Sequence, residues 1–215
     1  MTGRIGRLSW PQSRGMKLGL LLAAVSLVSA GCVSSTITAA STAPPPSPPA
    51  GTIIYGDSNL VFSQDNLPYG TIVRAQLGYA PCDWFDQMRR DAVKHPPIVV
   101  LVFTGNTYSD CASAKPRYSE YLQDFKMARS KFPSSTKVYV ALPPPTKSPA
   151  EKYPYYFVSA SNADVKQAVL DTGLPRVDTW TPLGGAAAPY AIWDGIHLNA
   201  TGQKIFATAL THAWW

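Results

Sequence analysis

Apolar runs of strand length alternate with stretches of helical period from about residue 51 to the end of the chain. This alternation is typical of a parallel sheet with helices on both faces. The run Ile98–Phe103 is apolar throughout, which indicates a central strand that is covered on both sides. The five strands that the pattern predicts are Thr52–Tyr55, Thr71–Ala75, Ile98–Phe103, Lys137–Leu142 and Arg176–Asp178.

Four further segments have apolar residues at helical spacing, and we expect each to cover a face of the sheet. Asp83 and Asn199 stand where the first and the last of these helices would begin, and both side chains are suited to cap a helix. By contrast, the stretch from Ser58 to Gly70 is short and is broken by Pro68, so it predicts an open loop. The expected helices begin near Asp83, Tyr118, Ser161 and Ala200 and end near Ala92, Phe132, Gly173 and Trp214. The predicted fold is a three-layer α/β/α domain with a central, mostly parallel five-stranded sheet.

The first 31 residues differ in character from the rest of the chain. They contain four basic residues and no acidic residue, and the apolar stretch Leu18–Val28 ends at Ser29-Ala30-Gly31-Cys32. That order is typical of a signal peptide. The apolar core of roughly 11 residues is too short to span a bilayer, which needs about 20. We therefore expect residues 1–31 to direct export, and translation from either Met1 or Met16 would supply the same arrangement.

The segment that ends at Cys32 resembles a bacterial lipobox, in which a small residue precedes a cysteine that is lipidated and becomes the new N-terminus. Ser29 departs from the leucine that is most usual three places earlier. The residues before Cys32 also fit ordinary signal peptidase cleavage, so release of a secreted protein is the alternative. Of the three cysteines, Cys82 and Cys111 can pair in an oxidising compartment. Cys32 would then have no disulfide partner, which favours its lipidation over release of a secreted protein with an unpaired thiol.

Composition divides the remaining chain into a tether and one domain. Residues 32–50 are almost all Ser, Thr, Ala and Pro, which is typical of a tether, and residues 51–215 are expected to form a single domain. Loss of the leader lowers Lys and Arg from 19 to 15 against 13 Asp and Glu, so the net charge falls from +6 to +2. The basic character therefore belongs to the leader and does not indicate nucleic-acid binding.

Four residues suited to chemistry lie beside the ends of predicted elements. Ser58, Gly78 and Asn106 each follow a predicted strand, and His197 precedes the last helix. Ligands of parallel sheets bind beyond the carboxyl ends of the strands. We therefore expect these four residues to meet at one edge of the sheet.

Ser58 becomes an effective nucleophile only when a base accepts its proton. His197 is the candidate base, because imidazole titrates near neutral pH, and Asp194 is placed three residues earlier to orient the ring. Asp57 is adjacent to Ser58 but is not the carboxylate that we assign to this array. The alternatives left open are a structural histidine at position 197, a turn-capping role for Asn106, and a positive φ angle as the requirement at Gly78.

In chain order these segments resemble the four sequence blocks of the SGNH or GDSL hydrolases: YGDSNL, the glycine of QLGYAPCDW, TGNT and DGIHLN. The second block, with a cysteine shortly after TGNT, looks most like exported actinobacterial members. The resemblance implies the flavodoxin-like SGNH fold and an oxyanion hole made by the backbone N–H groups of Ser58 and Gly78 and the side-chain amide of Asn106. It also implies a mainly structural role for Asp57. Asn59 and Thr107 depart from the usual residues of the blocks.

The sequence thus predicts an exported serine esterase that cleaves short acyl or O-acetyl carboxylic esters through an acyl-enzyme. An O-acyltransferase on envelope glycans would use the same residues, and a non-catalytic envelope-binding lipoprotein is a further interpretation, favoured by Asn59 and Thr107. We expect no cofactor, and no metal site once Cys82 and Cys111 are paired. The expected partners are an ester substrate and, through lipid on Cys32, the membrane.

Overall fold

The computed structural model describes residues 46–106, 111, 117–147, 159–192 and 194–215, which belong to one compact unit, Ala43–Trp215. The predicted signal peptide, Cys32 and residues 32–45 of the predicted tether lie outside the described residues. Within the described part of the chain, no helix combines the length and the apolar character needed to cross a membrane.

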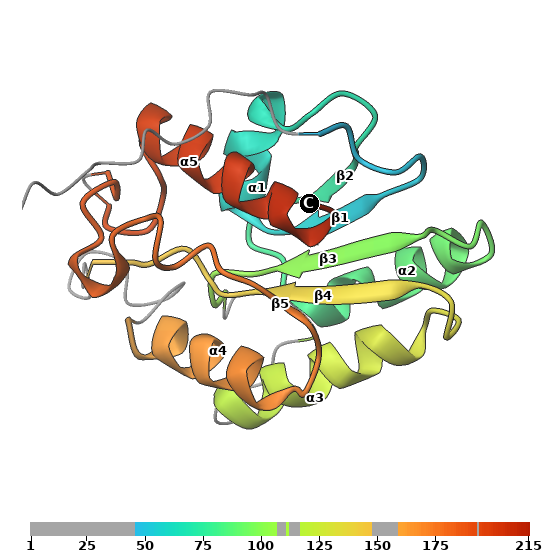
Figure 1. Ribbon diagram of the computed structural model, residues 1–215. Coiled ribbons are helices and arrows are strands. Elements are labelled where there is room, and N and C mark those ends of the chain that lie inside the picture. Colours follow the sequence, from blue (N-terminus) through green and yellow to red (C-terminus); the bar gives the residue numbers. More distant parts are fainter. Residues whose placement is uncertain (1–45, 107–110, 112–116, 148–158, 193) are drawn as a thin grey trace, which may run out of the picture. The chain divides into compact units, whose positions relative to one another are not determined.

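A five-stranded parallel sheet forms the centre of the unit (Figure 1). Its order, β2-β1-β3-β4-β5, is the flavodoxin-like order for a doubly wound sheet. Every residue of the central strand β3 is buried, as its apolar sequence predicts. The strands are β1 Ile53–Gly56, β2 Ile72–Ala75, β3 Ile98–Val102, β4 Lys137–Ala141 and β5 Arg176–Val177. All five predicted strands are confirmed, and no end is displaced by more than one residue.

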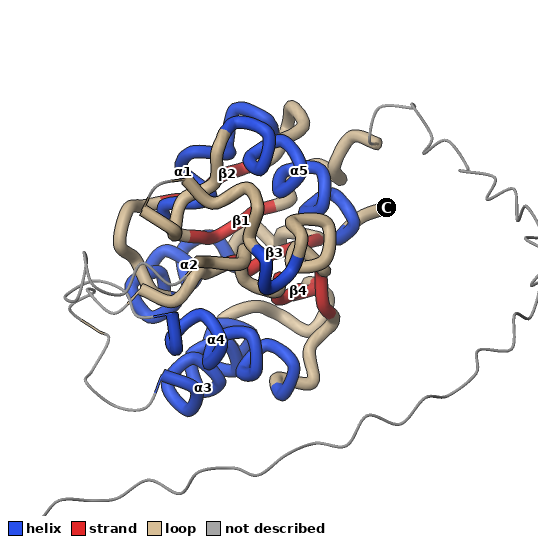
Figure 2. Tube along the Cα trace, turned by 90° about the vertical axis from the view of Figure 1, so that its left-hand side faces the viewer, coloured by secondary structure: helices blue, strands red, loops and turns tan. Residues whose placement is uncertain are grey.

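Helices cover both faces of the sheet, which confirms the three-layer α/β/α class. Figure 2 shows α1 and α5 on one side of the strands and α3 and α4 on the other. Side chains alternate along β3, so that Val99 and Leu101 pack with α2, α3 and α4, whereas Val100 and Val102 pack with α1 and α5. The helices are α1 Ser58–Ser63, α2 Phe85–Ala92, α3 Arg117–Ser130, α4 Ser159–Asp171 and α5 Ala200–Leu210.

The crossover after β1 differs from its prediction. It begins with a short helix, α1, and continues as the 3-10 helix Gln64–Asn66, so the expected open loop was wrong. Asp57 caps α1 by accepting a hydrogen bond from the N–H of Asn59. Pro68 lies beyond both helical turns and therefore breaks neither of them.

The two predicted helix caps have different outcomes. The side chain of Asn199 accepts a hydrogen bond of 2.9 Å from the N–H of Gly202 and so caps α5, as predicted. Asp83 does not cap α2. It lies within the 3-10 helix Pro81–Trp84, and its carboxylate accepts from the N–H of Ala80 at 2.7 Å.

The last residues of the predicted tether are bonded to the domain. Trp214 Nε1 donates to the carbonyl of Pro46 at 3.2 Å. The N–H and hydroxyl of Thr52 both donate to the carbonyl of Pro49, at 3.0 and 2.8 Å. Residues 46–50 therefore extend the folded unit toward the chain's N-terminus.

Candidate active site

Ser58, His197 and Asp194 form a continuous hydrogen-bonded array at the carboxyl edge of the sheet. His197 Nε2 lies 3.0 Å from Ser58 Oγ, and His197 Nδ1 lies 2.6 Å from Asp194 Oδ2. Ser58 begins α1 and is separated from the end of β1 by Asp57 alone, whereas the other two residues lie in the loop before α5. The structure therefore brings the three predicted residues together in the order hydroxyl, imidazole, carboxylate. Their catalytic roles remain predictions.

Asp194 orients the imidazole from within its own loop. One carboxylate oxygen accepts from the backbone N–H groups of Ile196 and His197, at 2.8 and 2.9 Å, and the other faces the ring. Burial by itself would raise the pKa of Asp194, but the hydrogen bonds from His197 and Ile196 outweigh burial and hold that pKa below its usual value. An ionised Asp194 can only accept, so Nδ1 carries the ring proton and Nε2 is left to accept from Ser58.

Close packing at Gly56 sets where Ser58 lies. A Cβ atom at Gly56 would lie 2.7 Å from the carbonyl oxygen of Val102 and 2.9 Å from Cβ of Leu60. The end of β1 thus approaches both β3 and the first turn of α1 more closely than any side chain allows. This approach fixes the start of α1, and with it Ser58, against the central strand.

Asp57 joins the ends of β1 and β3. Its carboxylate accepts from the N–H and hydroxyl of Thr104, at 2.6 and 3.1 Å, from the N–H of Asn59 at 3.2 Å and from the amide of Asn106 at 3.1 Å. Burial raises the pKa of Asp57 to about 6, and the bonds from Thr104 and Asn59 act in the opposite direction. These contacts agree with the structural role assigned to Asp57 from the sequence.

The sequence predicts the backbone N–H groups of Ser58 and Gly78 as oxyanion donors, and this role stays a prediction. The N–H of Ser58 belongs to the first turn of α1, which has no intrahelical acceptors. Within the described part of the chain, no acceptor engages that N–H or the N–H of Gly78. Gly78 has a φ angle of +77°, so the turn needs a glycine for its conformation as well.

The side chain of Asn106 is already engaged. Its Nδ2 donates to Asp57 Oδ2 at 3.1 Å and to the carbonyl of Tyr79 at 3.2 Å. Asn106 thereby ties the Gly78 loop to the ends of β1 and β3. Donation to an oxyanion would require one of these bonds to be exchanged, and the donor role of Asn106 stays a prediction.

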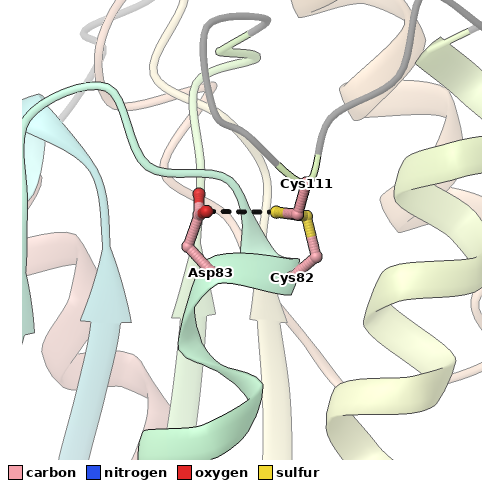
Figure 3. Close-up of side chains that lie close together, drawn as sticks. All are labelled: Cys82, Asp83 and Cys111. Carbon is pink, nitrogen blue, oxygen red and sulfur yellow. Dashed lines mark hydrogen bonds between the residues drawn. A yellow bond between two sulfur atoms is a disulfide. The ribbon is translucent and has the colours of Figure 1, made fainter.

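Cys82 and Cys111 are joined by a disulfide, as predicted, with their Cα atoms 6.1 Å apart. The bond connects the 3-10 helix after the Gly78 loop to the segment after Asn106. Figure 3 shows the carboxylate of Asp83 directed at the Cys111 sulfur, and the separation is 3.1 Å. Potential ligand atoms of Cys82, Asp83 and Cys111 lie within 4.8 Å of one another. Because the sulfurs are bonded to each other, they present no thiolate to a metal.

Phe62 and Asn59 contact the array, and sequence reasoning assigned a site role to neither. The ring of Phe62 meets the His197 ring edge to face, with centroids 5.1 Å apart, yet its side chain is 46% exposed. Helical spacing would have placed Phe62 on the same face as Ser58, four residues earlier, had the stretch been recognised as a helix. Asn59 hydrogen-bonds to the loop that carries His197. Thr107, the second departure from the family pattern, lies outside the described residues.

Solved structures of other proteins share this architecture. By contrast, no model of a protein family and no curated protein matches the sequence. Solved structures with the same fold include a GDSL-like lipase from Bacteroides thetaiotaomicron, at 17% identity and a TM-score of 0.55, covering 75% of this chain and 86% of that one. The C-terminal catalytic domain of peptidoglycan O-acetyltransferase A from Streptococcus pneumoniae matches at 19% identity and a TM-score of 0.52, covering 76% and 92% of the two chains. An acetylxylan esterase from Geobacillus stearothermophilus matches at 15% identity and 0.54, covering 80% and 97%. This chain therefore has the fold of the SGNH or GDSL lipases and acylhydrolases.

Proposed function

We propose that this protein is a serine esterase of the SGNH type that hydrolyses carboxylic esters. The observation that carries the proposal is the unbroken array from Ser58 through His197 to Asp194 at the carboxyl edge of the sheet. The same arrangement recurs on unrelated folds because it solves one chemical problem, the activation of a hydroxyl. The lipase and esterase named among the structural neighbours add support, since they share the fold and act on esters.

The first half of the reaction forms the acyl-enzyme. Ser58 Oγ attacks the ester carbonyl carbon while His197 Nε2 accepts the hydroxyl proton across the 3.0 Å contact. Negative charge develops on the carbonyl oxygen, where the N–H groups of Ser58 and Gly78 donate to it. Asp194 stabilises the imidazolium, which then gives its proton to the leaving alcohol as the ester bond breaks.

The second half releases the acid. A water molecule takes the place of the alcohol, and His197 accepts its proton as the water attacks the acyl carbon. The tetrahedral intermediate collapses, the bond to Ser58 Oγ breaks, and the proton returns to Oγ. The enzyme is regenerated with one ester and one water converted to one acid and one alcohol.

We propose short acyl or O-acetyl esters as substrates. Two structural neighbours, the acetylxylan esterase and the peptidoglycan O-acetyltransferase domain, are named for acetyl groups carried on glycans. Two exposed apolar residues of this chain are neighbours of proposed site residues, one by contact and one in sequence. Phe62 lies against His197, and Leu77, 54% exposed, immediately precedes Gly78. Apolar groups in these places suit contact with a small acyl group or with the apolar face of a sugar.

We also propose that the protein is exported and held at the outer face of the membrane by lipid on Cys32. The leader and the lipobox-like segment motivate this location. The Cys82–Cys111 disulfide supports export, because such bonds persist in oxidising compartments. Labelling with radioactive palmitate tests the anchor. Label that is lost in the variant Cys32→Ser is expected, and an unlabelled protein in the culture medium would favour free secretion.

Hydrolysis of p-nitrophenyl acetate, butyrate and octanoate by the purified protein tests the esterase proposal. We expect turnover that falls with acyl length and disappears in the variant Ser58→Ala. Turnover equal in the two proteins would contradict the proposal. Absence of turnover in both would favour a non-catalytic role for the fold.

O-acyl transfer to a glycan is the second candidate, and the structural likeness to a peptidoglycan O-acetyltransferase domain favours it. It shares the acyl-enzyme and differs only in the acceptor that attacks it. Chito-oligosaccharides added to the p-nitrophenyl acetate reaction distinguish the two activities. Acetylated sugar in the products would show transfer, whereas free acetate alone would show hydrolysis.

A further inference from the structure

Asn59 holds the backbone on both sides of His197. Its side-chain Oδ1 accepts from the N–H of Leu198 at 3.1 Å, and its Nδ2 donates to the carbonyl of Ile196 at 3.2 Å. These two peptide groups flank His197, so a single amide spans the residue that carries the imidazole. Asn59 is only 1% exposed, which makes both bonds expensive to lose.

Asn59 supplies the hydrogen bonds that join α1 to the backbone of this loop. Within the described part of the chain, the hydrogen bonds between α1 and the 194–198 loop are the two from Asn59 and the Ser58–His197 bond itself. Asp194 lies in the same loop as His197, so it can orient the ring but cannot place the loop relative to Ser58. Phe62 also contacts the His197 ring, and Leu60 and Leu198 share one apolar cluster, but of these contacts only the bonds of Asn59 fix the backbone of the loop in a defined direction against α1.

A second set of bonds fixes the orientation of the Asn59 amide. Its Nδ2 also donates to the hydroxyl of Thr104 at 3.0 Å, and that hydroxyl lies 3.1 Å from Asp57 Oδ1. When ionised, the carboxylate accepts only, so the Thr104 hydroxyl donates to it and offers a lone pair to Asn59. The direction of these hydrogen bonds leaves Nδ2 of Asn59 facing the carbonyl of Ile196 and Oδ1 facing the N–H of Leu198.

We propose that Asn59 is a positioning residue, which sets the position of the loop that carries His197 relative to the helix that carries Ser58. The inference rests on the proposed esterase function and adds to it the group that holds base and nucleophile within reach of each other. It also assigns a purpose to one departure from the family pattern, since an apolar residue at this position could not bond both peptide groups.

The variant Asn59→Leu tests the proposal, because leucine has nearly the same size and makes neither bond. We expect kcat for p-nitrophenyl acetate to fall about 10- to 100-fold with KM within about twofold of the wild type, since misplacement by about 1 Å slows the chemical step without removing substrate contacts. Labelling of Ser58 by a fluorophosphonate probe is expected to slow in parallel. The matched control is Val169→Ala in α4, which removes buried apolar volume on the other face of the sheet and is expected to lower the melting temperature but not kcat.

Proton NMR separates positioning from a general structural role. The His197 proton on its 2.6 Å bond to Asp194 is expected to give a downfield resonance, and the resonance is expected to persist in Asn59→Leu because both residues lie in one loop. Loss of this resonance together with activity would overturn the proposal, as would a kcat within twofold of the wild type. A wild-type protein that neither turns over esters nor reacts with the probe would overturn the proposed function on which the inference rests.

Discussion

The Cys82–Cys111 disulfide closes a loop of known length, so its contribution to stability can be calculated. The two cysteines are 29 residues apart in the sequence. The loop-closure model gives about 3.6 kcal/mol at 25 °C for such a loop. In a domain of this size each kcal/mol shifts the melting temperature by about 2 to 4 °C, so the double variant Cys82→Ala/Cys111→Ala is expected to melt roughly 7 to 14 °C lower.

Differential scanning calorimetry of the oxidised wild type and the double variant measures this difference. Cys32→Ser is the matched control, because it removes a cysteine and leaves the disulfide in place. A decrease of less than about 2 °C in the double variant would refute the loop-closure reasoning. An equal decrease in the control would show that the effect does not come from the disulfide.

The same variant tests whether the disulfide also prepares the oxyanion hole. The bond ties the segment after Gly78 to the segment after Asn106, and Asn106 donates to Tyr79 across the two loops. We expect turnover to fall, up to the roughly 100- to 1,000-fold loss that removal of one oxyanion donor causes. Intact turnover with a lowered melting temperature would show that the disulfide is only a structural crosslink.

Three further substitutions probe the site. Asp194→Asn is expected to lower kcat by about 10⁴-fold with little change in KM, because the amide would present its N–H to His197 and favour the wrong tautomer of the ring. Steady-state kinetics measures kcat and KM. Phe62→Ala is expected to raise KM for p-nitrophenyl octanoate about 4- to 15-fold, because the acyl chain would lose the burial of one or two CH2 groups at about 0.8 kcal/mol each. The fully exposed Tyr69→Ala serves as the control without effect. Gly56→Ala is expected to cost about 1 to 3 kcal/mol of stability in a denaturant titration, because its Cβ would press on the β3 backbone, and an unchanged midpoint would contradict the close packing at the end of β1.

The sheet could be predicted from sequence because each strand is a short apolar run bounded by polar or turn residues. The meeting of Ser58 with His197 followed from the same pattern, since both were placed at the carboxyl edge of a parallel sheet. The disulfide followed from the number of cysteines and their compartment. These features depend on local composition and on topology, and the sequence displays both.

Other features were missed for physical reasons. The helix α1 was overlooked because Pro68 was taken to break the whole stretch, although the helix is capped by Asp57 and ends at Ser63. Asp83 was predicted to cap α2, whereas its carboxylate bonds back to Ala80. The contact between Asn59 and Leu198 joins residues 139 positions apart, and no local periodicity signals such a pair. Long-range polar contacts of this kind are set by tertiary packing.

Trapping the acyl-enzyme tests most directly whether Ser58 is the nucleophile. The wild type and Ser58→Ala are mixed with p-nitrophenyl acetate, quenched in acid within the first turnovers, digested and examined by mass spectrometry. We predict an acetyl group on Ser58 in the wild type and no site-specific acetylation in the variant. Acetylation at another residue, or p-nitrophenol release by Ser58→Ala at the wild-type rate, would contradict a serine esterase mechanism at this site.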